Sequence, residues 1–497
     1  MKKSIQFFLV MVTLIIMGCE TDFDPQITGV LSPVNFPKTE KDFELYAMDC
    51  YRPFGSKWGY PGVSYQNMFF SPEYGHLVMN DLSGDQFRVF TNWGGFFEGF
   101  SKADFSFLRT QWKSSHYEKV RFITQMTKIL DDIDKAETLR EETKKRLMAE
   151  VRMSRGWTMF FLLHMYGPVP VIIDPNLIGT SAEADQTRPP VSFFVDIITA
   201  DLMYAAEHLP AKPAEYGRFN KGLALGILMR HHLQQKNWAD AITAGTTLLD
   251  MGYSLVGNYA SLFRSATERN NETIWAVSCD EGSTGQNYLG NFNAWSYYCY
   301  PNNMPGIATN TGWGPGVGVF SVRWDYYDTY DPQDSRREII ITSYTTAFGR
   351  EFNRTNMPGA VLRKYPDEDG PQYQGNDIVI LRHADVLLMM AEALNNHYNG
   401  PTQEAIEYIN SVRKRAGLSD LGPEDILNKD VFNDAILRER GWEMLFEGIR
   451  RLDLVRFGKW PQALIDAGKI PGPSHLFPVP QYAIDVSDGK LVQTDGY

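Results

Sequence analysis

Two stretches decide the fold: residues 218–253, 'RFNKGLALGILMRHHLQQKNWADAITAGTTLLDMGY', and residues 378–418, 'IVILRHADVLLMMAEALNNHYNGPTQEAIEYINSVRKRAGL'. Each stretch has a helix-forming segment rich in small residues, a short turn, and a second segment with alanines near its start, Ala239 and Ala241 in one and Ala405 in the other. Because small residues let two helices approach closely, each stretch predicts a helix–turn–helix unit of about 34 residues.

Such units resemble tetratricopeptide repeats, in which each unit buries its apolar face on the next. The alternative is a pair of unrelated helical hairpins. Two further patterns predict helices because apolar or small residues recur every three or four positions. The first set is Leu147, Val151, Ser154, Thr158, Phe161 and Met165, and its helix should end before Gly167. The second set is Ala405, Ile409, Val412 and Ala416.

Residues 254–376 differ in character from the rest of the chain. Glycine, asparagine, proline and tyrosine crowd together in 'GSTGQNYLGNFNAWSYYCYPNNMPGIATNTGWGPGVGVF' (282–320), which is too rich in turn formers for a regular helix. The sequence therefore predicts a mainly α protein, with a tetratricopeptide-like helical repeat scaffold and an inserted loop-rich, short-strand region.

The start of the chain predicts a lipid anchor. Lys2 and Lys3 precede an apolar stretch, residues 5–17, that is too short to span a bilayer, and Gly18 and Cys19 follow. This pattern resembles the bacterial lipobox, where the cysteine after the cut receives acyl chains. The alternative is an ordinary secretory signal with a chance cysteine.

The predicted organisation follows from these shifts in composition. We expect a lipoprotein signal peptide at 1–18, a lipidated tether at 19–40, an N-terminal helical, tetratricopeptide-like part at 41–253, a loop-rich ligand-binding region at 254–376, and C-terminal helical repeats at 377–497. The acidic residues Glu20, Asp22 and Asp24 resemble an address for the outer cell face, with a solvated tether as the alternative.

Composition limits the classes of partner. The 497 residues carry a net charge of -12 and no block of lysine or arginine, so we expect no nucleic-acid partner. Aromatic residues make up 13%, which is more than packing alone usually requires. Cys50, Cys279 and Cys299 have no zinc-site spacing, and we expect buried thiols, with a Cys279–Cys299 bridge as the alternative.

Four motifs occur in family order and resemble the SusD/RagB family. They are 'EVRMSRGWTMFFLLHMYGPVPVI' (150–172), 'RHADVLLMMAEALN' (382–395), 'ILRERGWEMLFEGIRRLDLVRFGKW' (436–460) and 'HLFPVPQYAIDVSDGKLVQTDGY' (475–497). One departure is that Val486, Ser487 and Asp488 replace the family's usual asparagine-proline. The resemblance covers residues 19–497.

The third of these motifs also has a physical interpretation. Glu439, Glu443 and Glu447 are neighbours on one helix face, and we expect Arg440, Arg450, Arg451 and Asp453 to complete a structural charge network with them. The alternative is a catalytic carboxylate pair for glycoside hydrolysis, which the clustered arginines disfavour because they keep both acids ionised.

Motifs for other chemistry are weak or missing. No P-loop, H-E-x-x-H or G-x-S-x-G pattern occurs, and we expect no enzymatic activity, cofactor or metal. Asp367, Glu368, Asp369 and Asp377 supply oxygens of the kind that calcium takes, but without EF-hand spacing, so a solvated acidic loop is expected.

The resemblance implies a function. It predicts a lipoprotein anchored in the outer membrane and facing the cell exterior, which captures oligosaccharides and passes them to a partner TonB-dependent outer-membrane transporter. Two alternatives stay open: a peptide-capturing lid of a similar transporter, and a surface glycoside hydrolase.

Aromatic residues in loops are the candidate ligand contacts, because flat rings stack on the C–H faces of sugars while polar groups bind the hydroxyls. The resemblance points first to Trp93, with Asn92 and Asp85 beside it, and then to Trp313. Trp295, Tyr298 and Trp58 are weaker candidates, and core packing is the alternative for each. Trp157, Trp238, Trp275 and Trp442 lie in periodic segments, so we expect them in the core.

Overall fold

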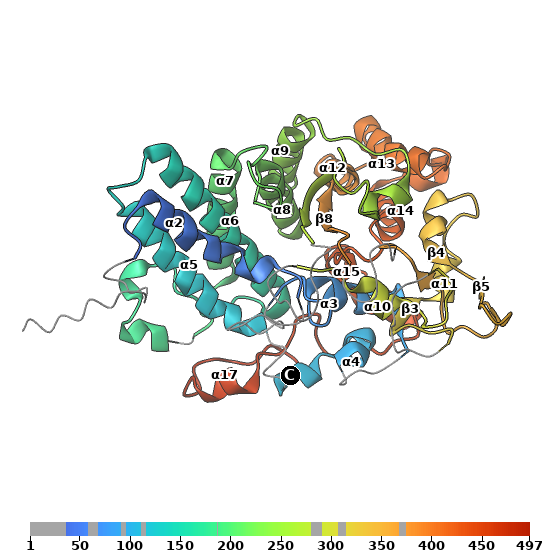
Figure 1. Ribbon diagram of the computed structural model, residues 1–497, viewed down its shortest axis with the longest axis horizontal. Coiled ribbons are helices and arrows are strands. Elements are labelled where there is room, and N and C mark those ends of the chain that lie inside the picture. The colour runs from blue at the N-terminus through green and yellow to red at the C-terminus, as the bar shows by residue number, and fades with distance from the viewer. Residues whose placement is uncertain are drawn as a thin grey trace, which may run out of the picture.

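The computed structural model describes residues 36–57, 68–90, 96–110, 116–185, 187–279, 291–306, 315–366 and 374–497. These residues are mainly helical, with a few short strands (Figure 1). The α-helices are α2 (Glu40–Ala47), α3 (His76–Leu82), α4 (Phe96–Lys102), α5 (Lys119–Asp134), α6 (Glu141–Tyr166), α7 (Val191–His208), α8 (Lys221–Gln234), α9 (Trp238–Leu249), α10 (Trp295–Cys299), α11 (Trp324–Tyr327), α12 (His383–His397), α13 (Gln403–Arg415), α14 (Lys429–Glu443), α15 (Arg450–Arg456), α16 (Trp460–Asp466) and α17 (Gln481–Asp485).

Shorter elements connect these helices. The 3₁₀-helices are η1 (Met48–Phe54), η3 (Ser106–Arg109), η5 (His116–Glu118), η6 (Pro175–Leu177), η7 (Ser181–Ala184), η8 (Tyr259–Phe263), η9 (Ser335–Ile339) and η10 (Pro423–Ile426). The strands are β1 (Phe87–Val89), β2 (Thr273–Val277), β3 (Phe320–Val322), β4 (Ile340–Ile341), β5 (Tyr344–Thr345), β6 (Glu351–Phe352), β7 (Val361–Leu362) and β8 (Ile378–Arg382). No helix of this described part is long and apolar enough to cross a membrane.

Helix α6 confirms the periodic pattern read from the sequence. All six residues of the predicted stripe are buried, and the helix ends before Gly167, whose φ of 73° suits glycine at a helix end. Helices α5 and α7 pack on α6, so this buried stripe forms the centre of the N-terminal half.

The two predicted repeat units form as well. Helices α8 and α9 make one antiparallel hairpin and α12 and α13 make the other, and α9 packs against α12. A Cβ atom at Gly245 of α9 would lie 2.3 Å from the sulfur of Met390 in α12, so a larger residue there would displace that side chain. The mainly α, tetratricopeptide-like scaffold is therefore confirmed.

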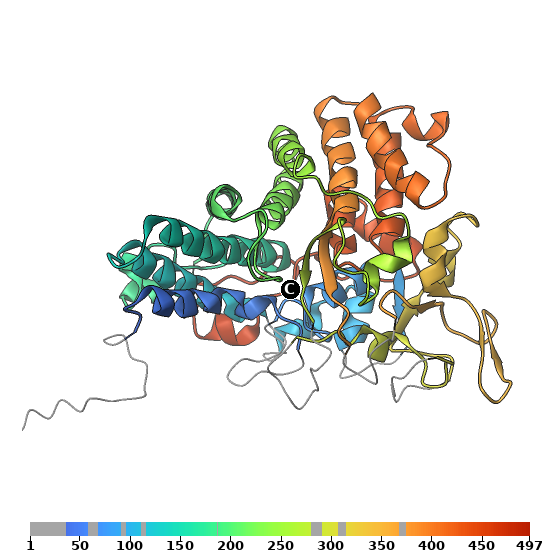
Figure 2. The same ribbon diagram turned by 45° about the horizontal axis from the view of Figure 1, so that its top comes forward.

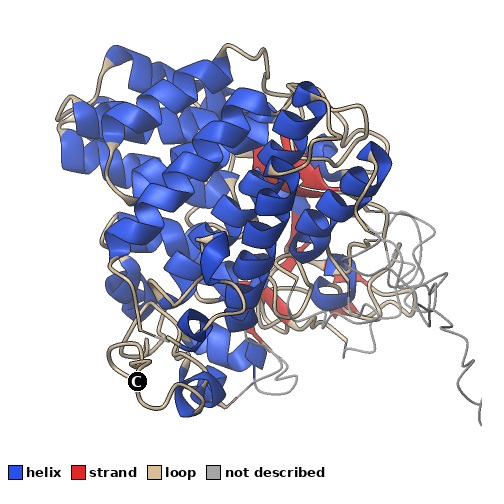
Figure 3. Ribbon diagram, turned by 90° about the vertical axis from the view of Figure 1, so that its left-hand side faces the viewer, coloured by secondary structure: helices blue, strands red, loops and turns tan. Residues whose placement is uncertain are grey.

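The inserted region contains loops and short strands, as predicted, and two of its strands pair antiparallel with β1 and β8, which lie outside residues 254–376. The pairs are β1 with β3, β2 with β8, β4 with β7, and β5 with β6. In β1–β3, Phe87 lies opposite Val322, so segments far apart in the chain meet there. Figure 3 shows the helices filling one side of the molecule and the short strands lying among loops on the other.

A main hydrophobic core joins these parts, and a second, smaller core cluster lies among α12, α13 and α14. Phe43, Trp157, Phe320 and Leu491 belong to the same cluster of buried side chains. The predicted boundaries at residues 40, 253 and 376 stay a prediction, and residues 1–18 lie outside the described residues.

The C-terminal signature forms a buried charge network, as predicted, but the predicted arginines do not pair with its glutamates. Glu443 is fully buried and accepts hydrogen bonds from Arg382, Arg415 and Arg336, and Glu447 pairs with Lys364 at 2.7 Å. Burial alone would raise the pKa of Glu443, but the three arginines hold it well below its ordinary value. These cations come from residues distant in sequence.

The predicted counter-charges have other partners. Arg440 pairs with Asp385 and Asp453 at 2.8 Å each, and Arg450 pairs with Asp85 at 2.7 Å. Arg451 donates instead to the side-chain oxygen of Asn80 at 3.0 Å. The sequence indicated which side chains are charged and close along the helix, but not which segments pack against them.

Two smaller predictions concern cysteines and calcium. Cys50, Cys279 and Cys299 are free buried thiols, so the alternative of a Cys279–Cys299 bridge is wrong. Asp367, Glu368 and Asp369 lie outside the described residues.

Candidate functional site

Several loops begin and end on one side of the molecule. The backbone N–H of Phe90 donates to the carbonyl oxygen of Val319 at 2.7 Å. The segment that ends just before residues 91–95 is therefore a neighbour of the segment that follows residues 307–314. Ser56 and Phe292 exchange two hydrogen bonds, and Asn293 forms a β-bridge with Gln374. We call the surface around Ser56, Phe90, Phe292, Val319 and Gln374 the loop-bearing face. It lies along the lower side of the molecule in Figure 2, below the helical repeats.

Helix α10 connects the segment that contains Ser56 and Phe292 to the segment that contains Phe90 and Val319. It begins three residues after Phe292, and the carbonyl of Tyr298 accepts a hydrogen bond from the N–H of Val319 at 2.7 Å. The loops that carry the predicted contacts thus start from one supported surface. Trp93, Asn92, Trp313 and Trp58 themselves lie outside the described residues and stay predictions.

Trp295 and Tyr298 require a correction. They are 2% and 0% exposed, because α10 turns both rings inward. Trp295 packs edge-on against Phe446 with ring centroids 4.6 Å apart, and the Tyr298 hydroxyl donates to Glu73 at 3.0 Å. These two side chains support the loop-bearing face from beneath and do not offer a ring to a ligand.

Asp85 also has a structural partner. Its carboxylate accepts two hydrogen bonds from Arg450, at 2.7 and 2.8 Å, and its side chain is 16% exposed. Burial would raise the pKa of Asp85, but the charge and hydrogen bonds of Arg450 lower it below the ordinary value. Asp85 therefore ties the segment just before β1 to α15, and its predicted role as a polar neighbour of a ligand stays a prediction.

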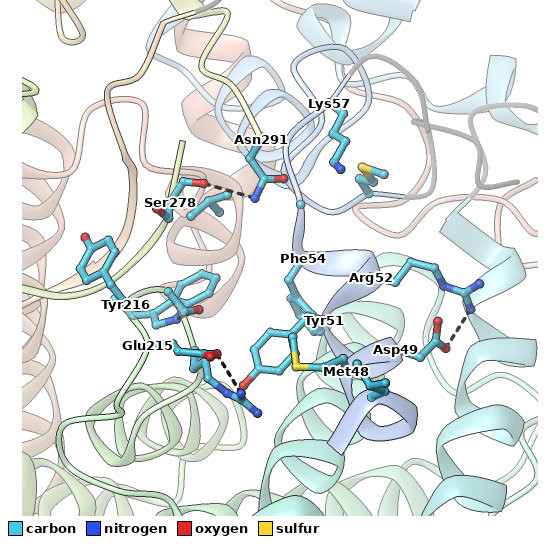
Figure 4. Close-up of a pocket in the computed structure, with 17 residues that line it drawn as sticks. Met48, Asp49, Tyr51, Arg52, Phe54, Lys57, Glu215, Tyr216, Ser278 and Asn291 are labelled. Atoms are coloured by element: carbon cyan, nitrogen blue, oxygen red, sulfur yellow. Dashed lines mark hydrogen bonds and ion pairs between the residues drawn. The ribbon is translucent and has the colours of Figure 1, made fainter. Parts of the chain in front are cut away.

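A cavity of about 650 Å³ opens beside the loop-bearing face (Figure 4). Helix α2, η1 and the segment 215–218 form its walls, with β2 behind them. Ser56, which bonds Phe292, precedes the lining residue Lys57. We call this cavity the face pocket; its lining includes Met48, Asp49, Tyr51, Arg52, Phe54, Lys57, Glu215, Tyr216, Arg218, Trp275, Ser278 and Asn291.

Aromatic side chains give the face pocket a firm apolar floor. Phe54 stacks on Trp157 with ring centroids 4.6 Å apart, and the Tyr51 hydroxyl donates to Glu150 at 3.0 Å. The indole N–H of Trp275 donates to the carbonyl of Gly217 at 3.2 Å. Because each ring is held by packing or a hydrogen bond, a ligand would pay little ordering cost to contact them. Trp157, Trp275 and Trp442 are buried, as predicted, and Trp238 is partly buried and packs against the core.

Tyr216 is the most exposed aromatic ring of the face pocket, and the sequence analysis did not select it. Its side chain is 47% exposed, while its hydroxyl donates to the buried carboxylate of Asp377 at 2.7 Å. The guanidinium of Arg269 lies 4.2 Å from the ring centroid. The ring is thus fixed at its hydroxyl and backed by a cation, which makes it a preorganised stacking surface.

The charged groups of the face pocket are paired. Arg218 donates to Glu150 at 2.8 Å and to Glu215 at 2.9 Å, and Arg52 lies 3.4 Å from Asp49. Burial raises the pKa of the Asp49 carboxyl and lowers that of the Lys57 ammonium. The pocket therefore combines ring faces with hydrogen-bonding groups, a mixture suited to a ligand that has both apolar faces and many hydroxyl or amide groups.

Nothing in the described ranges points to a metal centre. Among the residues that the structure describes, no cluster of three or more His, Cys, Asp or Glu side chains is placed to hold a metal ion. Asp377 serves the protein itself, since its second oxygen accepts the N–H of Cys279 at 2.9 Å.

Comparison with known protein families gives two matches. The model of the SusD family matches residues 338–497, and the model described as "Starch-binding associating with outer membrane" matches residues 101–233. The first matched segment contains the signature 436–460, and the second contains helix α6.

Individual proteins resemble the chain over most of its length. The SusD-like protein P25 of Formosa agariphila is 27% identical over 395 residues, covering 72% of each chain. A solved SusD homolog from Bacteroides thetaiotaomicron has a TM-score of 0.76 at 19% identity and covers 94% of this chain and 99% of its own. Surface glycan-binding protein A from the same organism, in complex with laminarihexaose, has a TM-score of 0.75 at 19% identity and covers 93% of this chain and 100% of its own.

Proposed function

Because this chain belongs to the SusD/RagB family, we propose that it is a cell-surface lipoprotein that binds oligosaccharides reversibly and passes them to a TonB-dependent transporter of the outer membrane. One observation carries the binding part of this proposal. The exposed Tyr216 ring, held by Asp377 and Arg269, lies in a pocket whose lining includes Lys57 and Met68, on either side of residues 58–67, and Ser278 and Asn291, close to either end of residues 280–290.

The chemistry of that arrangement fits a sugar chain. A pyranose ring has an apolar C–H face that stacks on an aromatic ring, and hydroxyls at its edge that accept and donate hydrogen bonds. In the face pocket, Tyr216 supplies the ring, and Glu215, Arg218 and Asn291 supply polar groups nearby. Trp93 and Trp313 would extend the stacking surface along the loop-bearing face.

Known relatives support a glycan as the ligand class. The structurally similar surface glycan-binding protein A was solved with laminarihexaose, and one matching family model is described as starch-binding. We infer from the same family description that the chain attaches to the outer membrane, through acyl chains on Cys19.

We propose binding without cleavage. The carboxylates of the signature, Glu439, Glu443 and Glu447, are at most 2% exposed and are salt-bridged, so they do not face the pocket. A glycosidase needs one carboxyl protonated as an acid beside a second one, and the arginines around Glu443 oppose protonation.

Isothermal titration calorimetry tests the ligand class. We expect saturable heat from hexasaccharides of one linkage in a panel of laminarihexaose, maltohexaose, cellohexaose and xylohexaose, and none from a tryptic digest of casein. Saturable heat from the casein digest alone would instead support the peptide-capturing alternative and overturn the glycan proposal.

A second assay on the same samples tests the absence of cleavage. Polysaccharide incubated with the purified protein should show no increase in reducing ends over a buffer control. A steady, protein-dependent increase would support the glycosidase alternative.

A further inference from the structure

A second cavity shares part of its wall with the face pocket. It has a volume of about 460 Å³. The rest of its wall comes from residues 211–214, from residues 251–253 just after α9, and from residues 269–276, which lead into β2. We call it the adjoining pocket; its lining includes Tyr216, Gly217, Tyr253, Arg269, Asn271 and Trp275.

The shared wall is low at one point. Tyr216, Gly217, Arg218 and Trp275 line both cavities, and Figure 4 shows Tyr216 at the edge of the face pocket. Gly217 has a φ of 87°, which suits glycine, and it carries no side chain that would stand between the cavities. A ligand chain that stacks on Tyr216 can therefore continue from one cavity into the other.

Arg269 supplies hydrogen-bond donors to the adjoining pocket. Its guanidinium lies 4.2 Å from the centroid of the Tyr216 ring, and its side chain is 61% exposed. Asp377 is 3.9 Å away, and in the part of the chain that the structure describes the guanidinium makes no hydrogen bond. Because stacking on a ring fixes the plane of a guanidinium, its N–H groups point in defined directions.

Tyr253 supplies a hydroxyl. Its ring is partly buried against the main core, and a Cβ atom at Gly222 of α8 would lie 2.9 Å from its hydroxyl oxygen. The glycine at this position therefore makes room for the tyrosine. Within the described residues this hydroxyl has no hydrogen-bond partner, so a ligand hydroxyl would not have to displace one.

Asn271 supplies an amide held on a fixed turn. The N–H of Ser254 donates to the carbonyl of Asn271 at 3.1 Å, and the side chain of Asn270 accepts the N–H groups of Glu272 and Thr273 at 2.9 and 3.1 Å. The side chain of Asn271 is exposed, and across the described ranges it makes no hydrogen bond. Its amide can both donate to and accept from sugar hydroxyls.

The charges around the adjoining pocket are largely balanced. Arg218 is paired with Glu150 and Glu215, and Arg269 lies near the carboxylate of Asp377. A guanidinium, a phenol and an amide with free hydrogen-bonding capacity then remain along the wall. This combination suits a neutral, hydroxyl-rich ligand better than an anionic one.

We propose that the adjoining pocket is a second subsite for the same oligosaccharide that occupies the face pocket. The chain would pass over Tyr216 and Gly217, and Tyr253, Arg269 and Asn271 would bind the hydroxyls of its far end. This inference rests on the proposed glycan-binding function. It predicts that affinity depends on chain length, because a short chain fills the face pocket alone.

Calorimetric titration with two chain lengths tests the proposal. The probes are the trisaccharide and the hexasaccharide of the linkage that the panel of hexasaccharides selects. The native protein should bind the hexasaccharide about tenfold or more tightly than the trisaccharide. Tyr253→Phe combined with Asn271→Ala should weaken hexasaccharide binding by about tenfold and leave trisaccharide binding unchanged, because only the longer chain reaches these groups.

A matched pair of substitutions serves as the control. Tyr398→Phe combined with Asn237→Ala removes an exposed hydroxyl at the end of α12 and an exposed amide before α9 that makes no capping hydrogen bond. Both dissociation constants should stay at their native values. Melting curves by circular dichroism should match that of the native protein for both double variants.

Two results would overturn the second subsite and leave the glycan-binding proposal standing. One is equal affinity of the native protein for both chain lengths, and the other is equal weakening of both lengths by Tyr253→Phe with Asn271→Ala, which would assign these groups to the first subsite. Absence of saturable heat with every oligosaccharide would instead overturn the glycan-binding function and the second subsite together.

Discussion

Tyr216 shows what determines a binding residue at the scale of one side chain. It stands in a segment between two helices, with no periodicity to mark it as exposed or buried. Its position depends on Asp377, which is 161 residues further along the chain, and on Arg269. Sequence reasoning therefore selected tryptophans in glycine-rich loops and missed a tyrosine whose neighbours come together only in the fold.

Substitution of Tyr216 should separate stacking from its hydrogen bond. Tyr216→Ala should weaken oligosaccharide binding by about 1 to 3 kcal/mol because the ring is lost, whereas Tyr216→Phe should keep most of the affinity. Calorimetric titration measures both. Tyr398→Ala, which removes an exposed ring at the end of α12, is the control and should have no effect. Native affinity in Tyr216→Ala would exclude the ring as a contact.

The two loop tryptophans lead to a similar prediction. Trp93→Ala and Trp313→Ala should each weaken oligosaccharide binding by about 1 to 3 kcal/mol if the rings stack on the ligand. The melting temperatures should barely change, because neither ring would then be part of the core. A large drop in melting temperature with either variant would instead identify that ring as a core residue.

At the scale of helices and strands, the periodicity of the sequence predicted which residues of a long helix are buried. The stripes of α6 and α13 were predictable because a helix buries every third or fourth residue whatever its partner is. Helix α10 is only five residues long, so its aromatic residues carry no period. Trp295 and Tyr298 were weaker candidates for ligand contact with core packing as the alternative, and the structure shows them in the core. The partners of Glu443 were missed because they depend on long-range packing.

The buried charge network should be essential for stability. Arg382→Met should destabilise the protein by about 3 to 5 kcal/mol, because it leaves Glu272, Glu443 and Glu447 buried without their shared cation. Urea unfolding followed by fluorescence measures the change in free energy. Arg354→Met removes an exposed arginine paired with Asp328 and should leave the unfolding midpoint nearly unchanged. Equal effects of the two variants would mean that the buried network contributes no more than a surface pair.

At the scale of the whole molecule, a helical frame supports the candidate binding region. The face pocket lies between α2, η1, β2 and the segment 215–218. The main core joins α8, α9 and part of α12 to the loop-bearing face, so the frame supports the loop ends, while a second core cluster lies among α12, α13 and α14.

The proposed anchor leads to a prediction for the intact cell. Cys19→Ala should release the protein from the outer-membrane fraction, because two or three acyl chains hold a protein by about 0.8 kcal/mol per buried methylene. Sedimentation of membranes followed by immunoblotting measures the distribution. Unchanged sedimentation of the variant would count against lipidation at this residue.

Hydrogen–deuterium exchange with and without the oligosaccharide selected by titration tests the central claim most directly, because it locates the ligand on the chain. We predict slower exchange in peptides that cover residues 84–106, 210–220 and 291–320, and no change in peptides that cover α12 to α14. Protection confined to α12, α13 and α14, with none near Tyr216 or the loop ends, would contradict the account.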